Sequence, residues 1–459
     1  MKVVPSDRPP DVVAVRSITI DVQEVMTDWE RFGEVMTREE LEKEVAAVRT
    51  MYKRKDRKVR PANIPLPGGI NPGGGVNIGG QLQEGETEDL EPWRRGGTTV
   101  PRGSRLTPER LKEMRIGIGL LWENEKQLFI DILFEHEGAI AFDDSEMGLL
   151  KSEIEPPVVI HTVPHTPWQQ ASLRLPRAVQ EIATERVKEK LANGLLEFSQ
   201  GPYRSRYFLV PKKNPGEYRM INDVQPLNKV TIRDAGMPPS VDEFSEEFAG
   251  YPVLTSVDYY SGYDQMTLDK RSRDLTAFQT DAGLVRQTCL PQGWTNWVAC
   301  FQRAIVKVHW KQIPKHARPF LDDVGLHGPK SRYNDEELSP GIRRFVWEHA
   351  QIFRQFMRDV WTSGMTISGR KTAIAMPGIT IVGMVCDFDG RHPEQKKAQK
   401  IVDWPAPRTV KEARGFIGLV VYYCIFISGF ATTAAPIFVL FRKGAQFNWT
   451  TECQLAMNE

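Results

Sequence analysis

The sequence is poor in cysteine and contains no long apolar run. Its five cysteines are dispersed over 459 residues at spacings that match no zinc-binding pattern. Buried free thiols in a reducing compartment are the simplest interpretation. No apolar stretch reaches the roughly 18 residues of a membrane-spanning helix, and the N-terminus lacks the apolar region of a signal peptide. We therefore expect a soluble, intracellular protein with no membrane partner.

The sequence also lacks a strong net charge. Lys and Arg number 60 against 59 for Asp and Glu, which gives a net charge of +1. This balance neither predicts nor excludes a nucleic-acid partner, so any basic surface must come from local clustering. Hydrophobic residues make up 41% of the chain, which is enough for ordinary globular cores. The length suggests about three domains.

Phosphate-binding glycine loops are missing as well. Gly73-Gly74-Gly75 lacks the Gly-Lys-Ser/Thr ending of such a loop, so the Gly- and Pro-rich stretch 61–99 is interpreted as a flexible linker. Upstream of it, the capping box Thr37-Arg38-Glu39-Glu40 predicts a helix that reaches Met51. We therefore predict an N-terminal extension over residues 1–106 that is partly helical and partly disordered.

The rest of the chain has the mixed pattern of an α+β protein. Thr107-Pro108-Glu109 begins a helical stretch to about Glu137, within a helical and extended lead-in over 107–170. Helices and strands then alternate irregularly, and the periodicity of the apolar residues predicts their positions. We expect helices at 177–193, 396–404 and 410–423, and strands at 207–210, 218–221, 253–258 and within 366–387.

Two adjacent carboxylates, Asp322 and Asp323, lie inside a short apolar run. Buried carboxylates are costly unless they are paired or hold a cation, and Mg²⁺ prefers such oxygen ligands. A solvated turn is the alternative, and Phe142-Asp143-Asp144, which has no strand-like continuation, is interpreted that way. A third carboxylate, Asp258, ends a predicted strand and favours a metal site for Asp322 and Asp323.

Three carboxylates suit phosphoryl transfer by two metal ions. Because successive side chains on a strand point to opposite faces, Asp322 and Asp323 can converge only at a hairpin turn. Gly325 makes such a turn plausible. Even there, we expect one of the two carboxylates to be the stronger ligand.

Other polar residues surround these carboxylates in the sequence. Lys212, Lys213 and Arg219 lie on one predicted hairpin and could hold phosphates, although a solvated turn also explains the two lysines. The Ser261-Gly262 bend would place Tyr263 near Asp258, with core packing of the ring as the alternative.

Gln292 and Gly293 lie between Pro291 and Trp294, in a loop that backbone or ligand could approach closely.

From about Pro202 to Asn458 the order of motifs resembles the reverse transcriptase and connection segment of gypsy-type LTR retrotransposons. Each motif alone is only weakly specific, but five motifs in the correct order make a highly specific match. The matching motifs are Tyr218-Arg219-Met220 with Leu227-Asn228-Lys229-Val230-Thr231, Ser256-Val257-Asp258 with Ser261 to Gln265, Leu290 to Asn296, Phe320-Leu321-Asp322-Asp323, and Asp403-Trp404-Pro405 with Gly415 to Tyr423.

The resemblance implies a fold and an activity. The fold would be an α+β right-hand polymerase, with fingers and palm in 171–375 and a thumb and connection segment in 376–459. The activity would be RNA-directed DNA polymerisation, with two Mg²⁺ ions, or Mn²⁺ as the alternative. The partners would be an RNA or DNA template with its primer, dNTPs, and the RNase H and integrase parts of a Pol polyprotein. The location would be cytoplasmic virus-like particles, with the nucleus as a second site.

The resemblance also assigns roles to the candidate residues. Asp258 and Asp322 would hold the metal ions, with Asp323 as a supporting carboxylate. Tyr263 would be the steric gate that blocks a ribose 2′-OH. The remaining assignments are triphosphate binding by Arg219 with Lys212 or Lys213, nucleotide contact by Gln292 and Gly293, and a primer-gripping hairpin at Val382-Gly383-Met384.

Two departures leave other hypotheses open. Cys424 stands where the family usually has Arg, and the sequence ends at Glu459, where RNase H would begin. We therefore expect a fragment of a longer polyprotein or a decayed copy. A catalytically dead remnant that only binds nucleic acid is the alternative. An RNA-directed RNA polymerase is a further one, against which Tyr263 argues.

Overall fold

The computed structural model describes residues 102–173, 175–211 and 218–459. Contacts divide the chain into one compact unit of residues 58–391 and a second unit that contains 392–459. The predicted helix at 37–51 and the predicted linker at 61–99 lie outside the described residues. The predicted boundary between 375 and 376 stays a prediction. Among the described residues, no helix is long and apolar enough to cross a membrane.

A five-stranded sheet forms the centre of the larger unit. Its strand order is β1-β14-β6-β10-β9, with β6 antiparallel to both β10 and β14. Apolar side chains of β6 and β10, such as Val257 and Leu326, are fully buried. The bounds are Arg115–Ile116 for β1, Ala373–Met376 for β14, Leu254–Asp258 for β6, Asp323–His327 for β10 and Ala317–Phe320 for β9.

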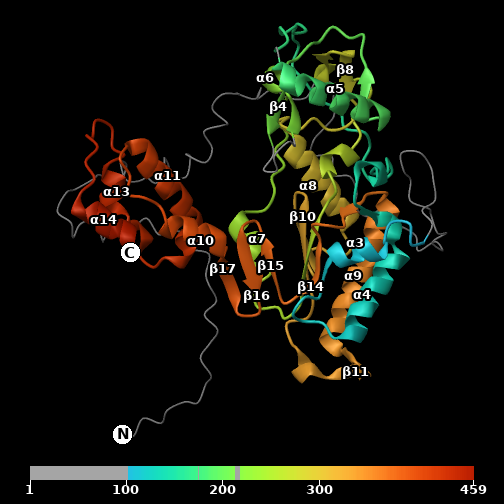
Figure 1. Cartoon of the computed structure of the whole chain (residues 1–459), viewed down its shortest axis with the longest axis vertical. Coiled ribbons are helices and arrows are strands. Elements are labelled where there is room, and N and C mark those ends of the chain that lie inside the picture. Colours follow the sequence, from blue (N-terminus) through green and yellow to red (C-terminus); the bar gives the residue numbers. More distant parts are fainter. Residues whose placement is uncertain (1–101, 174, 212–217) are drawn as a thin grey trace. The chain divides into compact units, whose positions relative to one another are not determined.

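Long helices pack beside this sheet (Figure 1). The longest, α9, contacts α4, α8, β10 and β14. Its buried residues recur every three or four positions, as in Phe345, His349, Phe353 and Phe356, which gives one continuous apolar face. The helices are α3 (Pro108–Glu113), α4 (Glu123–Glu135), α8 (Trp297–Val308) and α9 (Arg344–Ser363).

A smaller group of elements gathers at the other end of this unit (Figure 1). It has its own apolar core, which includes Val187, Tyr207 and Phe278. The elements are α5 (Arg177–Ala192), β3 (Leu196–Phe198), β4 (Tyr207–Pro211), β5 (Tyr218–Asn222), α6 (Gln225–Val230), β7 (Phe278–Thr280) and β8 (Gly283–Gln287).

Short elements complete the larger unit and lead out of it. The β2 and β13 strands pair in parallel, while β11 with β12 and β15 with β16 form antiparallel pairs. Their bounds are Ile140–Ala141 for β2, Val241–Glu246 for α7, Glu337–Ser339 for β11, Ile342–Arg343 for β12, Ile367–Ser368 for β13, Gly378–Ile381 for β15, Met384–Asp387 for β16 and Gly390–Pro393 for β17.

The described part of the second unit is helical. Phe416, Ile417, Ile437 and Cys453 form its core. Its helices are α10 (Gln395–Val402), α11 (Val410–Val420), α12 (Phe430–Thr433), α13 (Ala435–Val439) and α14 (Thr451–Asn458).

These elements confirm the predicted α+β class and most of the predicted segments. The helical stretch expected to reach Glu137 is wrong in one respect, because β1 interrupts it and pairs with β14. The helix expected at 410–423 ends at Val420, and the following residues form a 3₁₀ turn, η7 (Val421–Phe426). Neither α8 nor α9 was among the predicted helices.

Candidate active site

The three predicted carboxylates lie where β6 and β10 meet. Asp258 is the last residue of β6 and Asp323 is the first of β10, and the antiparallel register places the two opposite each other. A two-residue turn, Leu321–Asp322, joins β9 to β10. The backbone N–H of Tyr259 donates to the carbonyl of Asp322 at 3.0 Å. The predicted hairpin is therefore confirmed, and it brings all three carboxylates to one end of the sheet.

Gly325 has a different role from the one expected. It lies inside β10 rather than in the turn, and a Cβ at this position would collide with the ring of Phe248. The close approach of Phe248 therefore requires glycine here. The turn depends instead on Leu321, whose φ of 58° is unusual for a residue with a side chain.

A buried glutamine of α8 holds the hairpin. The Gln302 side-chain amide donates to the carbonyl of Pro319 at 2.9 Å, and its oxygen accepts from the N–H of Leu321 at 2.8 Å. These bonds fix the backbone on the β9 side of the turn. Gln302 was not among the predicted site residues. The apolar periodicity of 297–308 could have revealed the helix, but nothing in the pattern marks this side chain.

The carboxylates influence one another electrostatically. Burial, Asp322 and Asp258 together raise the pKa of Asp323 to about 6. Burial and Asp322 also raise the pKa of Asp258, against the opposing effect of Lys371. The backbone register pairs Asp258 with Asp323, but Asp322 is the carboxylate whose charge raises the pKa of both of the others.

Lys371 forms an ion pair within the site that the sequence analysis did not predict. Its Nζ lies 2.9 and 3.2 Å from the two carboxylate oxygens of Asp258. Lys371 lies between β13 and β14 and is largely exposed, whereas Asp258 is mostly buried. A single lysine in a turn has no sequence signal, so only the fold shows this pairing.

The residues present fit a divalent cation. In the part of the chain that the structure describes, no three His, Cys, Asp or Glu side chains are already arranged to hold a metal ion. The three carboxylates nevertheless supply the oxygen donors that Mg²⁺ prefers. Burial and the charges of Asp322 and Asp258 raise the pKa of Asp323, and a bound cation would relieve the repulsion among the three carboxylates. Lys371 already offsets part of this repulsion, because its ammonium group pairs with the Asp258 carboxylate.

Tyr263 lies near the three carboxylates, and its ring packs against aromatic side chains of α8. It belongs to the 3₁₀ turn η4 (Gly262–Gln265), and its ring centroid is 4.0 Å from that of Trp297 and 4.6 Å from that of Phe301. Burial and the charges of Asp322, Asp323 and Asp258 raise the pKa of its hydroxyl. The ring therefore packs on α8, and its hydroxyl lies within reach of the carboxylate charges. A role as the steric gate stays a prediction.

The remaining candidates occupy exposed positions. Gln292 and Gly293 are exposed, and Gly293 has a φ of 87°, a conformation that favours glycine. Asn228 donates to the carbonyl of Gly293 at 2.9 Å, which ties this loop to α6. Arg219 is exposed on β5 opposite Val210. Lys212 and Lys213 lie outside the described residues.

The predicted primer-gripping hairpin is present as a hairpin. Val382 and Gly383 form its two-residue turn between β15 and β16, with φ values of 43° and 78°. Two successive positive φ angles are typical of the tight turns that join antiparallel strands. Contact of this hairpin with a primer stays a prediction.

Comparison with solved structures supports a polymerase fold. The foamy viral protease-reverse transcriptase bound to double-stranded DNA aligns with a TM-score of 0.65 and 21% identity, over 76% of this chain and 57% of that one. The same viral protein bound to an RNA/DNA hybrid aligns with a TM-score of 0.62, over 76% of this chain and 44% of that one. The predicted right-hand polymerase fold is therefore confirmed.

Comparison of sequences gives the family. The model for "Reverse transcriptase (RNA-dependent DNA polymerase)" matches residues 210–403. The Pol polyprotein of the Drosophila melanogaster transposon gypsy is 28% identical over 61% of this chain and 26% of its own length. The Tf2-3 polyprotein of Schizosaccharomyces pombe is 23% identical over 62% of this chain and 20% of its own length. This chain thus spans about a quarter of the length of such relatives. Residues 210–403 thus match the reverse transcriptase family, and the chain is similar to the Pol polyprotein of the transposon gypsy.

Proposed function

We propose that this chain is an RNA-directed DNA polymerase that extends a primer with dNTPs. One observation carries the proposal, the convergence of Asp258, Asp322 and Asp323 at the end of two paired strands within the family match. Phosphoryl transfer needs little covalent chemistry from the protein and depends on positioning and on stabilising developing charge. A rigid hairpin that presents carboxylates is suited to that task.

Reverse transcriptases generally use divalent metal ions. We propose two Mg²⁺ ions here, with Mn²⁺ as an alternative, held by Asp258 and Asp322 and supported by Asp323. When bound, such a pair stabilises the attacking and leaving oxygens of an in-line displacement. Asp258 must exchange its ion pair with Lys371 for contact with the cation, which leaves the Lys371 ammonium at the edge of the site.

The other candidates would hold the nucleotide. The Tyr263 ring, backed by Trp297 and Phe301, would block a ribose 2′-OH. Exposed Arg219 would bind the triphosphate bidentately. We propose that Lys212 or Lys213 assists it, and that Gln292 and Gly293 contact the incoming nucleotide.

The proposed partners are a primed RNA or DNA template and the other parts of a Pol polyprotein, RNase H and integrase. The foamy viral relatives were solved with double-stranded DNA and with an RNA/DNA hybrid, which supports nucleic-acid partners for this chain too. The matched relatives are Pol polyproteins, which supports the presence of companion domains.

Primer extension tests the proposal directly. We expect the full chain to extend a DNA primer on an RNA template when Mg²⁺ and dNTPs are present, and to stop when the divalent ion is chelated. A folded protein that binds the template with the usual salt dependence but adds no nucleotide would instead be a remnant that only binds nucleic acid.

Replacing Tyr263 with alanine should relax the choice of sugar. Removing the ring opens the space that a 2′-OH would occupy, so we expect the preference for dNTPs over rNTPs to fall by about tenfold or more. The measurement is the ratio of kcat/KM for dCTP and rCTP. Tyr263→Phe keeps the ring and should keep the preference. An unchanged ratio in Tyr263→Ala would show that the gate lies elsewhere.

A further inference from the structure

A stretch of chain upstream of the family match lies against both loops of the candidate site. We call this stretch, residues 140–150, the brace. It contains β2 and the short 3₁₀ helix η3 (Asp144–Glu146), and it precedes residue 210, where the family match begins. Asp143 and Asp144 are exposed, as expected for a turn, but each has a side-chain partner. Asp143 pairs with Arg110 of α3, whereas Asp144 accepts from Tyr260 of a site loop.

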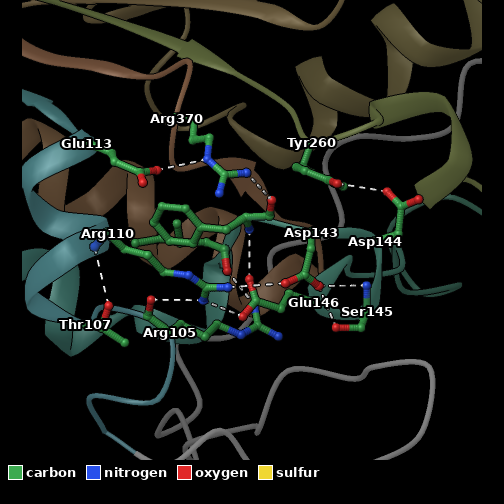
Figure 2. Close-up of polar contacts among 12 residues, drawn as sticks. Arg105, Thr107, Arg110, Glu113, Asp143, Asp144, Ser145, Glu146, Tyr260 and Arg370 are labelled. Carbon is green, nitrogen blue, oxygen red and sulfur yellow. Dashed lines mark hydrogen bonds and ion pairs between the residues drawn. The ribbon is translucent and has the colours of Figure 1, made fainter. Parts of the chain in front are cut away.

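The first site loop joins Asp258 to Tyr263. The hydroxyl of Tyr260, in the middle of this loop, donates to Asp144 Oδ1 at 2.8 Å (Figure 2). The Tyr260 backbone N–H donates to the carbonyl of Thr366 at 3.1 Å, and Thr366 Oγ1 accepts from a backbone N–H of the brace at 3.0 Å. Side-chain and backbone contacts therefore tie this loop to the brace.

The second site loop carries Lys371, the partner of Asp258. Arg370 donates from Nη1 to the carbonyl of Phe142 at 2.9 Å, and the N–H of Gly369 donates to the carbonyl of Ala141 at 3.1 Å. A Cβ at residue 369 would collide with the Phe142 ring, so the loop approaches the brace as closely as glycine allows. The brace therefore contacts both sequences that supply the Asp258–Lys371 pair.

The brace is itself anchored to α3. Arg110 pairs with Glu146 at 2.7 Å and with Asp143 at 3.2 Å, and its guanidinium lies 4.6 Å from the centroid of the Phe142 ring (Figure 2). Asp143 connects the brace to α3 and also caps η3, because its Oδ1 accepts from the backbone N–H of Ser145 at 3.0 Å. Asp144 connects the brace to the site loop.

We propose that the brace is a positioning element for the active site, and that Asp144 acts through Tyr260 to place Tyr263 and Asp258. The proposal rests on the proposed polymerase function. Asp144 is a positioning residue that touches neither nucleotide nor metal. Its effect should appear in nucleotide binding and in the choice of sugar, because Tyr260 lies three residues before the ring of the gate.

Hydrogen exchange tests the brace without requiring activity. In the full chain, Asp144→Ala should speed amide exchange in peptides that cover 259–264, because the loop loses its tether. Asp144→Asn keeps an acceptor oxygen and should behave like the wild type. Asp143→Asn keeps the oxygen that accepts from the Ser145 N–H but removes the charge that pairs with Arg110, and it should leave this segment unchanged. Unchanged exchange in Asp144→Ala, or equal acceleration in Asp143→Asn, would overturn the proposal.

Steady-state kinetics with dNTPs test the proposal through activity. We expect Asp144→Ala and Tyr260→Phe each to raise the KM for dNTPs by about three- to tenfold and to weaken the preference for dNTPs, with kcat little changed. The double variant should be no worse than either single one, because both remove the same bond. A KM shift of equal size in Asp143→Asn, or additive effects in the double variant, would contradict the proposal. If the wild type adds no nucleotide, the proposed function fails, and hydrogen exchange still decides the brace.

Discussion

Asp258→Asn and Asp322→Asn should each lower the rate of primer extension by about a thousandfold or more. Asparagine keeps the volume of the side chain but removes the charge that would hold a divalent cation. Losing one well-placed electrostatic interaction at such a site costs about 4 kcal/mol, which corresponds to about a thousandfold in rate. The measurement is single-turnover extension at saturating Mg²⁺ and dNTP.

The raised pKa of Asp258 and one control variant separate loss of activity from misfolding. Burial disfavours the charged form of Asp258, since its pKa is raised in the folded chain, so removing the charge should not unfold the protein. Asp269→Asn removes a carboxylate that pairs with Arg271 outside the site and should leave the rate unchanged. Near-normal extension by folded Asp258→Asn would remove this carboxylate from the mechanism.

Asp323→Asn should cost less activity than Asp322→Asn. The charge of Asp322 raises the pKa of both other carboxylates, so Asp322 lies close to both of them. Asp323 begins β10, and because successive side chains of a strand point to opposite faces, we expect one member of the pair to be the direct ligand and the other a supporting one. Equal losses in the two variants would show that both carboxylates bind the metal ions directly.

The candidate site illustrates what local sequence pattern can and cannot predict. Asp258 and the Asp322–Asp323 pair were predictable because a strand end and an apolar run mark them, and the alternation of side chains required a hairpin. Gly325 was misassigned because a glycine in a turn and a glycine beneath an aromatic ring look the same in sequence. Only the position of Phe248, far along the chain, distinguishes the two.

The supporting residues could not be predicted for a related reason. Lys371 meets Asp258 across 113 residues of chain, and the Gln302 side chain reaches the hairpin only because α8 packs against β9. Neither contact has a periodic or compositional signature. The α9 helix, by contrast, does have one, since its buried residues recur at helical spacing over Arg344–Ser363. This apolar periodicity alone predicts the α9 helix.

Breaking the buried ion pair between Glu125 and Arg343 should destabilise the larger unit by about 3–5 kcal/mol. Glu125 is fully buried and Arg343 almost so, and Nη2 of the arginine lies 2.7 Å from Oε2 of the glutamate. The two residues are 218 positions apart and join α4 to the start of α9. Arg343→Met leaves the buried Glu125 carboxylate without its partner. Glu125→Gln leaves the buried Arg343 guanidinium with only the partly exposed Asp335, whose Oδ1 lies 3.5 Å from its Nη1.

Further contacts of Glu125 and Arg343 explain why the expected loss of stability is large. Glu125 also accepts from the backbone N–H groups of Trp122 and Arg343, both at 2.9 Å. Arg343 donates to the carbonyl of Leu120 at 2.7 Å, and its guanidinium lies 4.5 Å from the centroid of the Trp122 ring. One broken pair therefore disturbs the beginning of α4 and the beginning of α9 together.

Denaturant unfolding of the full chain, followed by tryptophan fluorescence, measures the loss. The exposed pair Arg354–Glu135 offers a matched control, because it joins the same two helices at 2.9 Å. Its removal by Arg354→Gln should cost less than about 1 kcal/mol. The double variant Glu125→Gln/Arg343→Met should be more stable than the sum of the single losses predicts, since neither charge remains unpaired. Strictly additive losses would mean that each residue stabilises the fold through its own contacts, and that the charge pairing contributes little.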